Sequence, residues 1–376
     1  MTMRKLHVLV VDDSAVVREA MATVLSMASG ITVTTAADPI IARHKIAAAR
    51  PDVILLDLEM PRENGLSFLR ELVATDPIPV VICSSHSTAG SKVALDALRE
   101  GAVDVVAKPR LGVREFVQES AILIVDAVRA AAGARRPAPA SAPSSTSPLR
   151  RLRPSKMRAA TAAGQPSRRV IAIAASTGGP QALNQVLGAM PADTPGIVVV
   201  QHMPAGFTTA FASHLDRQCG IEVKEAANGD PVLDGCALIA PGDRHIAVVR
   251  TRGQLHVEVR GGPLVSRHRP SADILFGSVA RTLGREAIGV IMTGMGDDGA
   301  DGLREMRNAG ASTIAQDEAS CVVFGMPREA IARGAVCEVE ALDDIASAIV
   351  RWAQPPARSE IPLSHPLILE WSKNRS

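Results

Sequence analysis

Three polar groups capable of hydrolytic chemistry each follow an apolar run that is typical of a buried strand. The runs and groups are Val170–Ala175 with Ser176, Gly196–Gln201 with His202, and Ala287–Met292 with Asp297-Asp298. Because the carboxyl ends of neighbouring parallel strands meet at one sheet edge, we expect these groups to face one crevice. A serine, a histidine base and a carboxylate that orients the base form the usual set for nucleophilic acyl transfer.

The turn Ser176-Thr177-Gly178-Gly179-Pro180 is compatible with two kinds of site. Its backbone N–H groups stand beside a hydroxyl and can hold an anion. Ser176 is therefore either a nucleophile whose oxyanion these amides stabilise or part of a loop that cradles a phosphate. No lysine follows Gly178-Gly179, which weakens the nucleotide-binding alternative, because a Walker loop requires one. The GxSxG elbow of standard α/β-hydrolases is absent too.

A second group of polar residues follows strand-like runs near the N-terminus. These residues are Asp12-Asp13 after Leu6–Val11, Asp57 after Val53–Leu56, Ser84 after Val80–Cys83, and Lys108 after Asp104–Ala107. Three carboxylates at one sheet edge repel one another unless a cation lies among them. Mg²⁺ accepts carboxylate, carbonyl and water ligands. A lysine and a serine at the same edge can contact a phosphoryl group.

This N-terminal pattern resembles the receiver domain of two-component response regulators over residues 4–131. The matching segments are Asp12-Asp13, Asp57-Leu58-Glu59-Met60-Pro61, Ser84 and Lys108-Pro109. The resemblance implies that Asp57 accepts a phosphoryl group from a phosphohistidine kinase. It also implies a Mg²⁺ site formed by Asp12, Asp13, Asp57 and the Glu59 carbonyl. Ser84 and Lys108 would then contact the phosphoryl group, and Ser84 would switch the outer face.

Five motifs in the C-terminal half resemble the chemotaxis protein-glutamate methylesterases, in the same order over about residues 168–350. They are Ala175–Pro180, Gln201-His202-Met203-Pro204, Pro241-Gly242-Asp243-Arg244-His245, Arg267-His268-Arg269-Pro270-Ser271 and Thr293–Gly299. A receiver joined by a linker to such a domain is also that family's architecture. The resemblance implies that Ser176 is the nucleophile and His202 the general base and acid. Asp298, rather than Asp297, would orient His202.

By the same resemblance, Ser176 attacks the γ-methyl ester of a receptor glutamate, methanol leaves, and water hydrolyses the acyl-enzyme. The same route with an amide leaving group would deamidate glutamine. Backbone amides at Thr177 or Met295 are candidate oxyanion donors. The esterase chemistry needs no cofactor. The expected partners are methyl-accepting chemoreceptors as substrates and a chemotaxis histidine kinase as phosphoryl donor. We expect neither nucleic-acid binding nor membrane insertion.

The linker would allow the receiver to lie over the active-site cleft. We hypothesise that the unphosphorylated receiver hinders substrate entry and that phosphorylation at Asp57 loosens the contact. The alternative function is a response regulator with a non-catalytic binding output, such as a DNA-binding domain. The charge distribution argues against that alternative. Residues 133–169 carry nine Lys and Arg and no Asp or Glu, so the net charge of +2 becomes −7 for the rest of the chain.

The elements that must position these residues alternate between strands and helices. Before the linker, the predicted helices are 14–28, 40–49, 66–74, 92–100 and 114–131. Fully apolar strands between such helices predict a parallel sheet covered on both faces. The section 223–263 is rich in turns and predicts antiparallel hairpins. The predicted fold is therefore α/β, with two doubly wound parallel-sheet domains: a flavodoxin-like receiver and a Rossmann-like hydrolytic domain with a hairpin section.

We predict a receiver at 1–132, a flexible basic linker rich in Pro, Ala and Ser at 133–168, a catalytic domain at 169–353 and a tail at 354–376. Of the 376 residues, 47% are apolar, enough for two cores. The five cysteines form no CxxC pair and suggest neither a disulfide framework nor a zinc site. No secretory signal or membrane-spanning run is evident, so we expect a cytoplasmic protein.

Overall fold

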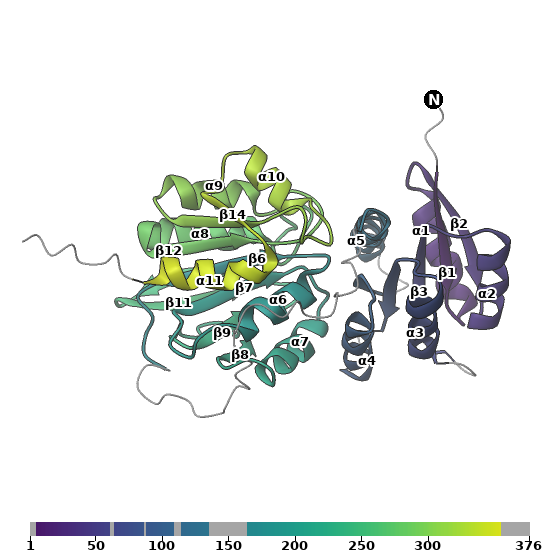
Figure 1. Ribbon diagram of the computed structural model, residues 1–376, viewed down its shortest axis with the longest axis horizontal. Helices are drawn as coiled ribbons and strands as arrows, with labels where there is room; N and C mark the ends of the chain where they lie inside the picture. The colour runs from purple at the N-terminus through teal and green to yellow at the C-terminus, as the bar shows by residue number, and fades with distance from the viewer. Residues whose placement is uncertain (1–4, 61–63, 86–87, 109–113, 135–163, 355–376) are drawn as a thin grey trace, which may run out of the picture.

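The computed structural model describes residues 5–60, 64–85, 88–108, 114–134 and 164–354. Within these ranges the chain forms two parallel sheets, each covered by helices, and Figure 1 shows them side by side. The two-domain α/β fold predicted from the sequence is confirmed. Most of the predicted linker (135–163) and of the predicted tail (355–376) lies outside the described residues, so those boundaries stay predictions. Among the described residues, no helix is both long and apolar enough to cross a bilayer.

The first sheet has the strand order β2-β1-β3-β4-β5, with every pair parallel. Its strands are β1 (Leu6–Val11), β2 (Ile31–Ala36), β3 (Val53–Asp57), β4 (Val80–Ser84) and β5 (Asp104–Ala107). The helices are α1 (Ala15–Ser26), α2 (Pro39–Ala48), α3 (Gly65–Thr75), α4 (Thr88–Arg99) and α5 (Arg114–Ala132). This is the flavodoxin-like order, in which β1 and β3 are neighbours at the point where the connections reverse direction.

The second sheet has the order β14-β13-β12-β6-β7-β9-β8, again with every pair parallel. Its strands are β6 (Val170–Ala175), β7 (Gly196–Gln201), β8 (Glu222–Glu225), β9 (Cys236–Ile239), β12 (Ala287–Ile291), β13 (Ser312–Gln316) and β14 (Glu338–Glu340). The helices are α6 (Gly179–Gly188), α7 (Phe207–Asp216), α8 (Ala272–Leu283), η1 (Gly284–Glu286), α9 (Ala300–Asn308), α10 (Met326–Ala332) and α11 (Leu342–Ala353). The three strands expected to carry the polar groups, β12, β6 and β7, are direct neighbours.

The prediction of antiparallel hairpins over 223–263 is only partly right. β10 (His245–Thr251) and β11 (Gln254–Arg260) do form an antiparallel hairpin. β8 and β9, however, pair parallel to each other within the main sheet. The short connection between them contains no helix, and a parallel crossover usually does contain one, which is why the segment looks like a hairpin in sequence. In addition, α4 begins at Thr88 rather than at residue 92.

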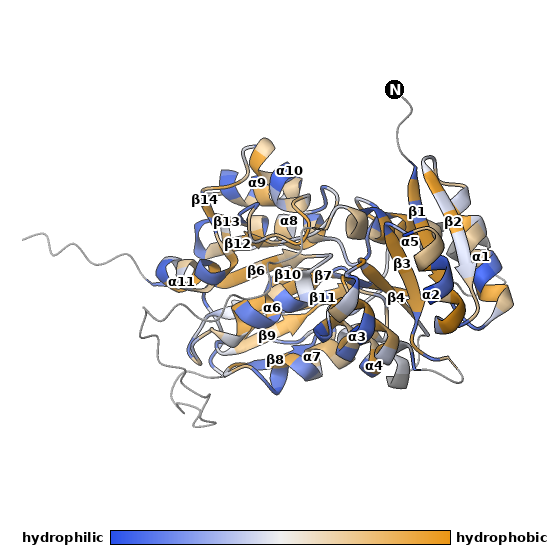
Figure 2. Ribbon diagram, turned by 45° about the vertical axis from the view of Figure 1, so that its right-hand side comes forward, coloured by the Kyte–Doolittle hydropathy of each residue, from blue (hydrophilic) through white to orange (hydrophobic). Residues whose placement is uncertain are grey.

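Aliphatic side chains fill both cores, as expected of a chain with so few aromatic residues. The strands β3, β6 and β7 are buried along their whole length. Figure 2 shows these inner strands as predominantly apolar, while polar residues lie on the outer helices. Strands that are buried on both faces leave their polar neighbours only one location, the loops at their carboxyl ends.

Candidate active site and phosphoacceptor pocket

Ser176 and His202 are held at the sheet edge by backbone hydrogen bonds between neighbouring strands. The Ser176 N–H donates to the Thr293 carbonyl at 3.0 Å, and the His202 N–H donates to the Ala175 carbonyl at 3.1 Å. The side-chain amide of Gln201 donates to the Ser176 carbonyl at 2.9 Å. The loop after β12 is therefore bonded directly to the turn after β6, so the three strand ends share one crevice.

Two glycines make this close approach possible. Gly178 has a φ of +79° just before α6, in the left-handed region that favours glycine. A Cβ on Gly294 would lie 2.7 Å from the Cβ of Ser176. Any larger residue at 294 would push the β12 loop away from the nucleophile candidate.

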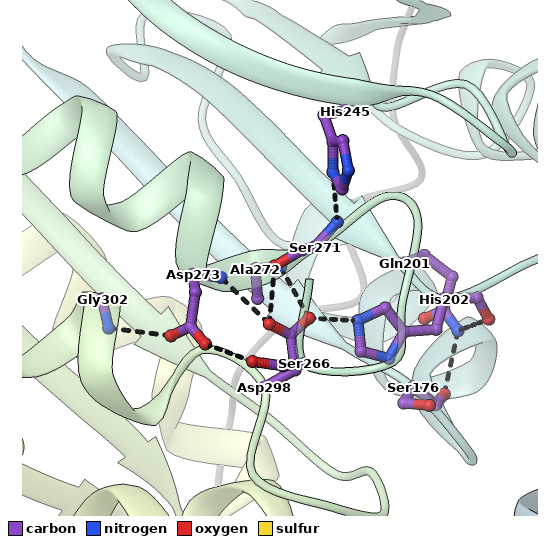
Figure 3. Close-up of polar contacts among 10 residues, drawn as sticks. All are labelled: Ser176, Gln201, His202, His245, Ser266, Ser271, Ala272, Asp273, Asp298 and Gly302. Carbon is purple, nitrogen blue, oxygen red and sulfur yellow. Dashed lines mark hydrogen bonds and ion pairs between the residues drawn. The ribbon is translucent and has the colours of Figure 1, made fainter. Parts of the chain in front are cut away.

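Asp298 is fully buried and lies two residues before α9 in the sequence. Its carboxylate contacts the N-terminus of α8. Its Oδ2 lies 2.8 Å from His202 Nε2, and Figure 3 shows the contact. Asp298 also accepts hydrogen bonds from the Ser271 hydroxyl at 2.7 Å and the Ala272 N–H at 2.7 Å. Burial alone would raise the pKa of Asp298, but the hydrogen bond with His202 and the N–H donors outweigh it and lower that pKa. The site therefore holds a charged carboxylate beside the histidine.

Asp297 lies elsewhere. Its carboxylate pairs with Arg333 at 2.7 Å and is half-exposed, away from His202. Of the two adjacent acids, Asp298 is thus the one placed to orient the histidine.

The second ring nitrogen of His202, Nδ1, is buried and has no hydrogen-bond partner among the described residues. In Figure 3 this nitrogen lies on the side of the ring toward Ser176. With Nε2 donating its proton to Asp298, Nδ1 carries the lone pair. The ring can therefore accept a proton on the side where the serine stands.

Two backbone amides beside the crevice are free to hold an oxyanion. Among the described residues, no acceptor bonds to the N–H of Thr177 or of Met295. Thr177 directly follows Ser176. Met295 follows Gly294, which packs closely against Ser176. Both were predicted as oxyanion donors, and both line the same cavity as Ser176.

The motif 267–271 and His245 lie around His202 and Asp298. The ring of His268 stacks on that of His202. His245 is buried; its Nδ1 accepts from the Ser271 N–H at 3.3 Å and its Nε2 contacts the Pro263 carbonyl at 2.8 Å. Ser271 as a donor to Asp298 was not predicted. Its position just before the apolar pattern of α8 is a helix N-cap signal that could have marked it.

A cavity of about 210 Å³ separates the two domains at this site. Its lining residues include Asp104, Leu123 and Asp126 from the first domain and Ser176, Thr177, His202, Arg267 and His268 from the second. The Thr177 hydroxyl donates to Asp104 at 2.5 Å, and Arg267 lies 3.4 Å from Asp126. Burial is the main cause that raises the pKa of Asp104 to about 6. Gln181 on α6 also donates to the Leu98 carbonyl at 2.8 Å.

The predicted phosphoacceptor residues of the first domain also lie together. Carboxylate oxygens of Asp12, Asp13 and Asp57 lie within 4.8 Å of one another. Lys108 Nζ lies 2.7 Å from Asp57 and 2.9 Å from Asp12. Burial, more than the opposing contact with Lys108, raises the pKa of Asp57, while the two carboxylates raise that of Lys108 despite its burial.

The other two residues predicted for this pocket are Ser84 and Glu59, and their predicted contacting groups are not bonded to the carboxylates among the described residues. Ser84 is buried at the end of β4, and its carbonyl accepts from the Lys108 N–H at 2.9 Å, but its hydroxyl points to the Ser85 carbonyl at 3.4 Å. The Glu59 N–H donates to Asp57 at 3.1 Å. A set of three carboxylates with a neighbouring backbone carbonyl suits a hard cation such as Mg²⁺.

Comparisons with known proteins assign both halves of the chain. The family model "CheB methylesterase" matches residues 171–349, and "Response regulator receiver domain" matches residues 8–119. The protein-glutamate methylesterase/protein-glutamine glutaminase 5 of Anaeromyxobacter dehalogenans is 56% identical, over 93% of this chain and 97% of the relative. A relative of the same name, numbered 3, from Geobacter metallireducens is 51% identical, over 93% and 99%. The Thermotoga maritima CheB methylesterase catalytic domain, known from a crystal structure, is 36% identical in sequence. The match covers 49% of this chain and 97% of the Thermotoga chain, with a TM-score of 0.48.

Proposed function

The chain belongs to the family of protein-glutamate methylesterases/protein-glutamine glutaminases, and on that premise we propose that it hydrolyses glutamate γ-methyl esters on chemoreceptors and deamidates receptor glutamines during chemotaxis adaptation. The observation that carries the proposal is the alignment of Ser176, His202 and the charged, buried Asp298 at three neighbouring strand ends. We assign them as nucleophile, general base and acid, and orienting carboxylate.

The reaction follows from this geometry. His202 Nδ1 takes the proton of Ser176 as Oγ attacks the ester carbonyl carbon, and Asp298 stabilises the resulting imidazolium. The N–H groups of Thr177 and Met295 donate to the oxyanion, each contributing about 3 kcal/mol to lowering the barrier. His202 then gives its proton to the methoxy oxygen, and methanol leaves. Water repeats the sequence on the acyl-enzyme and releases glutamate and free Ser176.

Glutamine deamidation uses the same route with a different leaving group. Ammonia is a poorer leaving group than methanol, so collapse of the tetrahedral intermediate depends more strongly on protonation by His202. The deamidation rate should therefore be the more sensitive of the two rates to any change at His202 or Asp298.

The first domain provides the control input. We propose that Asp57 is phosphorylated by a histidine kinase, with Asp12, Asp13, Asp57 and the Glu59 carbonyl as the ligands of Mg²⁺. When bound, Mg²⁺ supplies positive charge to the phosphoryl oxygens. Lys108, which already contacts Asp57, would pair with the phosphoryl group, and Ser84 would reorient its hydroxyl toward it.

Contacts between the domains support a gating role for the receiver. Asp104 touches Thr177 and Asp126 touches Arg267, so receiver side chains line the cavity that contains Ser176. These groups would stand in the way of a protein substrate that approaches the serine. We propose that phosphorylation at Asp57 weakens this docking and opens the crevice. We also propose that the protein acts in the cytoplasm.

Methanol release from methylated receptor membranes tests the function. Ser176→Ala should abolish it while circular dichroism and thermal unfolding stay unchanged. The matched control, Ser213→Ala, alters an exposed serine on α7 whose hydroxyl donates to the Thr209 carbonyl, and it should release methanol at the wild-type rate. A folded wild-type protein that releases no methanol would instead favour a non-catalytic binding output.

A further inference from the structure

The ring of His268 lies flat against that of the proposed base. The two ring centroids are 3.8 Å apart and the planes are inclined by only 8°. His268 is buried, with 8% of its surface exposed. None of the proton transfers described above uses this side chain, yet it covers a whole face of His202.

The contact with Asp298 leaves part of the orientation of His202 undetermined. The hydrogen bond between Nε2 and Asp298 fixes the position of that one nitrogen. It does not by itself fix the tilt of the ring plane, on which the direction of Nδ1 depends. Proton transfer requires the Nδ1 lone pair to point at Ser176 Oγ. A flat ring packed on one face fixes that tilt. We propose that His268 is a positioning residue, which fixes the plane of His202 so that Nδ1 faces the serine.

The turn that carries His268 is built to hold the ring in place. Val265 and His268 exchange backbone hydrogen bonds at 3.1 and 2.9 Å, which closes a two-residue turn. Ser266 and Arg267 within it have φ values of 49° and 68°, a conformation that non-glycine residues adopt at a cost. Such a conformation persists when the surrounding structure imposes it.

The same helix start holds both the turn and Asp298. The Ser266 hydroxyl donates to Asp273 at 2.9 Å, and the Asp273 N–H donates to Asp298 at 3.2 Å. Figure 3 shows both bonds at the first turn of α8. His268 and Asp298 are therefore held by the same set of hydrogen bonds. Asp298 fixes the position of Nε2 of His202, and His268 fixes the plane of its ring.

His268 also has the right charge for this role. Burial, with a smaller effect from His202, lowers the pKa of His268 to about 3. The titratable and charged groups that face it are His202, Asp298 and Arg267. A ring that stays neutral does not oppose the positive charge that His202 gains when it accepts the proton of Ser176.

The inference rests on the proposed function, and a pair of substitutions tests it. His268→Phe keeps a flat ring of similar size, whereas His268→Leu keeps apolar bulk without a flat face. With acetyl phosphate and Mg²⁺ present, we expect the full-length Leu variant to lose about tenfold to hundredfold in kcat with little change in KM. The Phe variant should stay within about threefold of wild type. His256→Leu, outside the cavity, is the matched control and should retain the wild-type kcat.

The rate at which a fluorophosphonate labels Ser176 gives a readout that assumes no substrate. It should fall in the Leu variant by the same factor as kcat and be preserved in the Phe variant. Equal rates for the Phe and Leu variants, or a rise in KM at unchanged kcat, would overturn the positioning role. If the Leu variant does not fold, loss of labelling in a folded Phe variant overturns it. A wild-type protein that is labelled but releases no methanol would contradict the proposed function alone.

Discussion

Each of the two domains has a buried carboxylate at the carboxyl edge of its parallel sheet, and the two carboxylates have opposite electrostatic environments. Asp57 and Asp298 are 1% and 0% exposed; Asp57 is the last residue of β3, and Asp298 lies in the loop after β12. Yet the pKa of Asp57 lies above its ordinary value and that of Asp298 below it. Asp298 accepts from two backbone N–H groups, a hydroxyl and His202. Asp57 shares Lys108 with Asp12.

The difference separates a carboxylate whose charge is balanced by its neighbours from a group of carboxylates whose charge is not. The Asp298 charge is already compensated, which suits the proposed reaction, in which positive charge develops on His202. The receiver pocket has more negative charge than its own groups neutralise, which favours the arrival of a cation. Electrostatic environment, rather than burial, thus distinguishes the proposed orienting carboxylate, Asp298, from the proposed phosphoacceptor, Asp57.

The strongest test of this comparison is removal of the compensated charge. Asp298→Asn should lower the methylesterase kcat by about a thousandfold to ten-thousandfold, because the histidine loses its orienting and stabilising partner. Asp297→Asn, at the adjacent position, should change kcat by less than about threefold. Methanol release by the two purified variants measures both. Comparable losses in the two would refute the assignment of Asp298.

Removal of the uncompensated charge should affect control instead. In Asp57→Asn, addition of acetyl phosphate and Mg²⁺ should leave the methylesterase rate unchanged, since no carboxylate is available for phosphorylation. Wild-type protein should be stimulated under the same conditions, as should Asp76→Asn, which alters a receiver carboxylate paired with Arg50. Stimulation of the Asp57 variant would show that the phosphoryl group acts at another residue.

Asp104 connects the receiver to the catalytic domain through Thr177 and should make the basal rate depend on pH. Burial raises its pKa to about 6 in the docked state. We expect undocking to expose this carboxyl and to return its pKa toward the ordinary 3.8, so that the docked state binds a proton more tightly than the free receiver. Lowering the pH through about 6 therefore favours docking, and the Asp104 charge opposes docking at higher pH. Asp104→Asn should lower the basal rate severalfold at pH 8, where the wild-type group is charged.

The difference should shrink below pH 6, where Asp104 is protonated. It should also disappear when phosphoryl donor is present, because the receiver is then released. A basal rate that rises in Asp104→Asn at pH 8 would mean that the charged contact with Thr177 stabilises docking.

The smallest expected effects are on stability, and their signs oppose each other. Asp298→Asn should lower the calorimetric transition of the catalytic domain, whereas Asp57→Asn should raise that of the receiver, each by a few degrees. A lowered pKa means that the Asp298 contribution is present above pH 4 or so and is lost as the pH falls through the folded-state pKa. A raised pKa means that the Asp57 penalty disappears on acidification. Shifts of the same sign in the two variants would contradict the comparison.

Much of the fold could be predicted because apolar runs report burial directly. The strands Leu6–Val11, Val170–Ala175 and Gly196–Gln201 have the bounds expected from their sequences. The parallel pairing of β8 with β9 could not be predicted, since a short crossover without a helix has the local pattern of a hairpin. The strands β13 and β14 were not predicted either.

The sequence by itself determined which residue types stand at the ends of the buried strands. Ser176, His202 and Asp57 are direct neighbours of apolar runs, and that adjacency is a local property of the chain. Family resemblance then distinguished Asp298 from Asp297, which local pattern could not do.

Only the tertiary structure decided the environment of each group. The N–H donors that hold Asp298 come from α8, the ring that covers His202 comes from the turn before it, and Asp104 reaches Thr177 from the other domain. Each contact joins residues far apart in the chain. Because pKa values and ring orientation depend on these distant partners, they follow from packing and cannot be derived from local sequence.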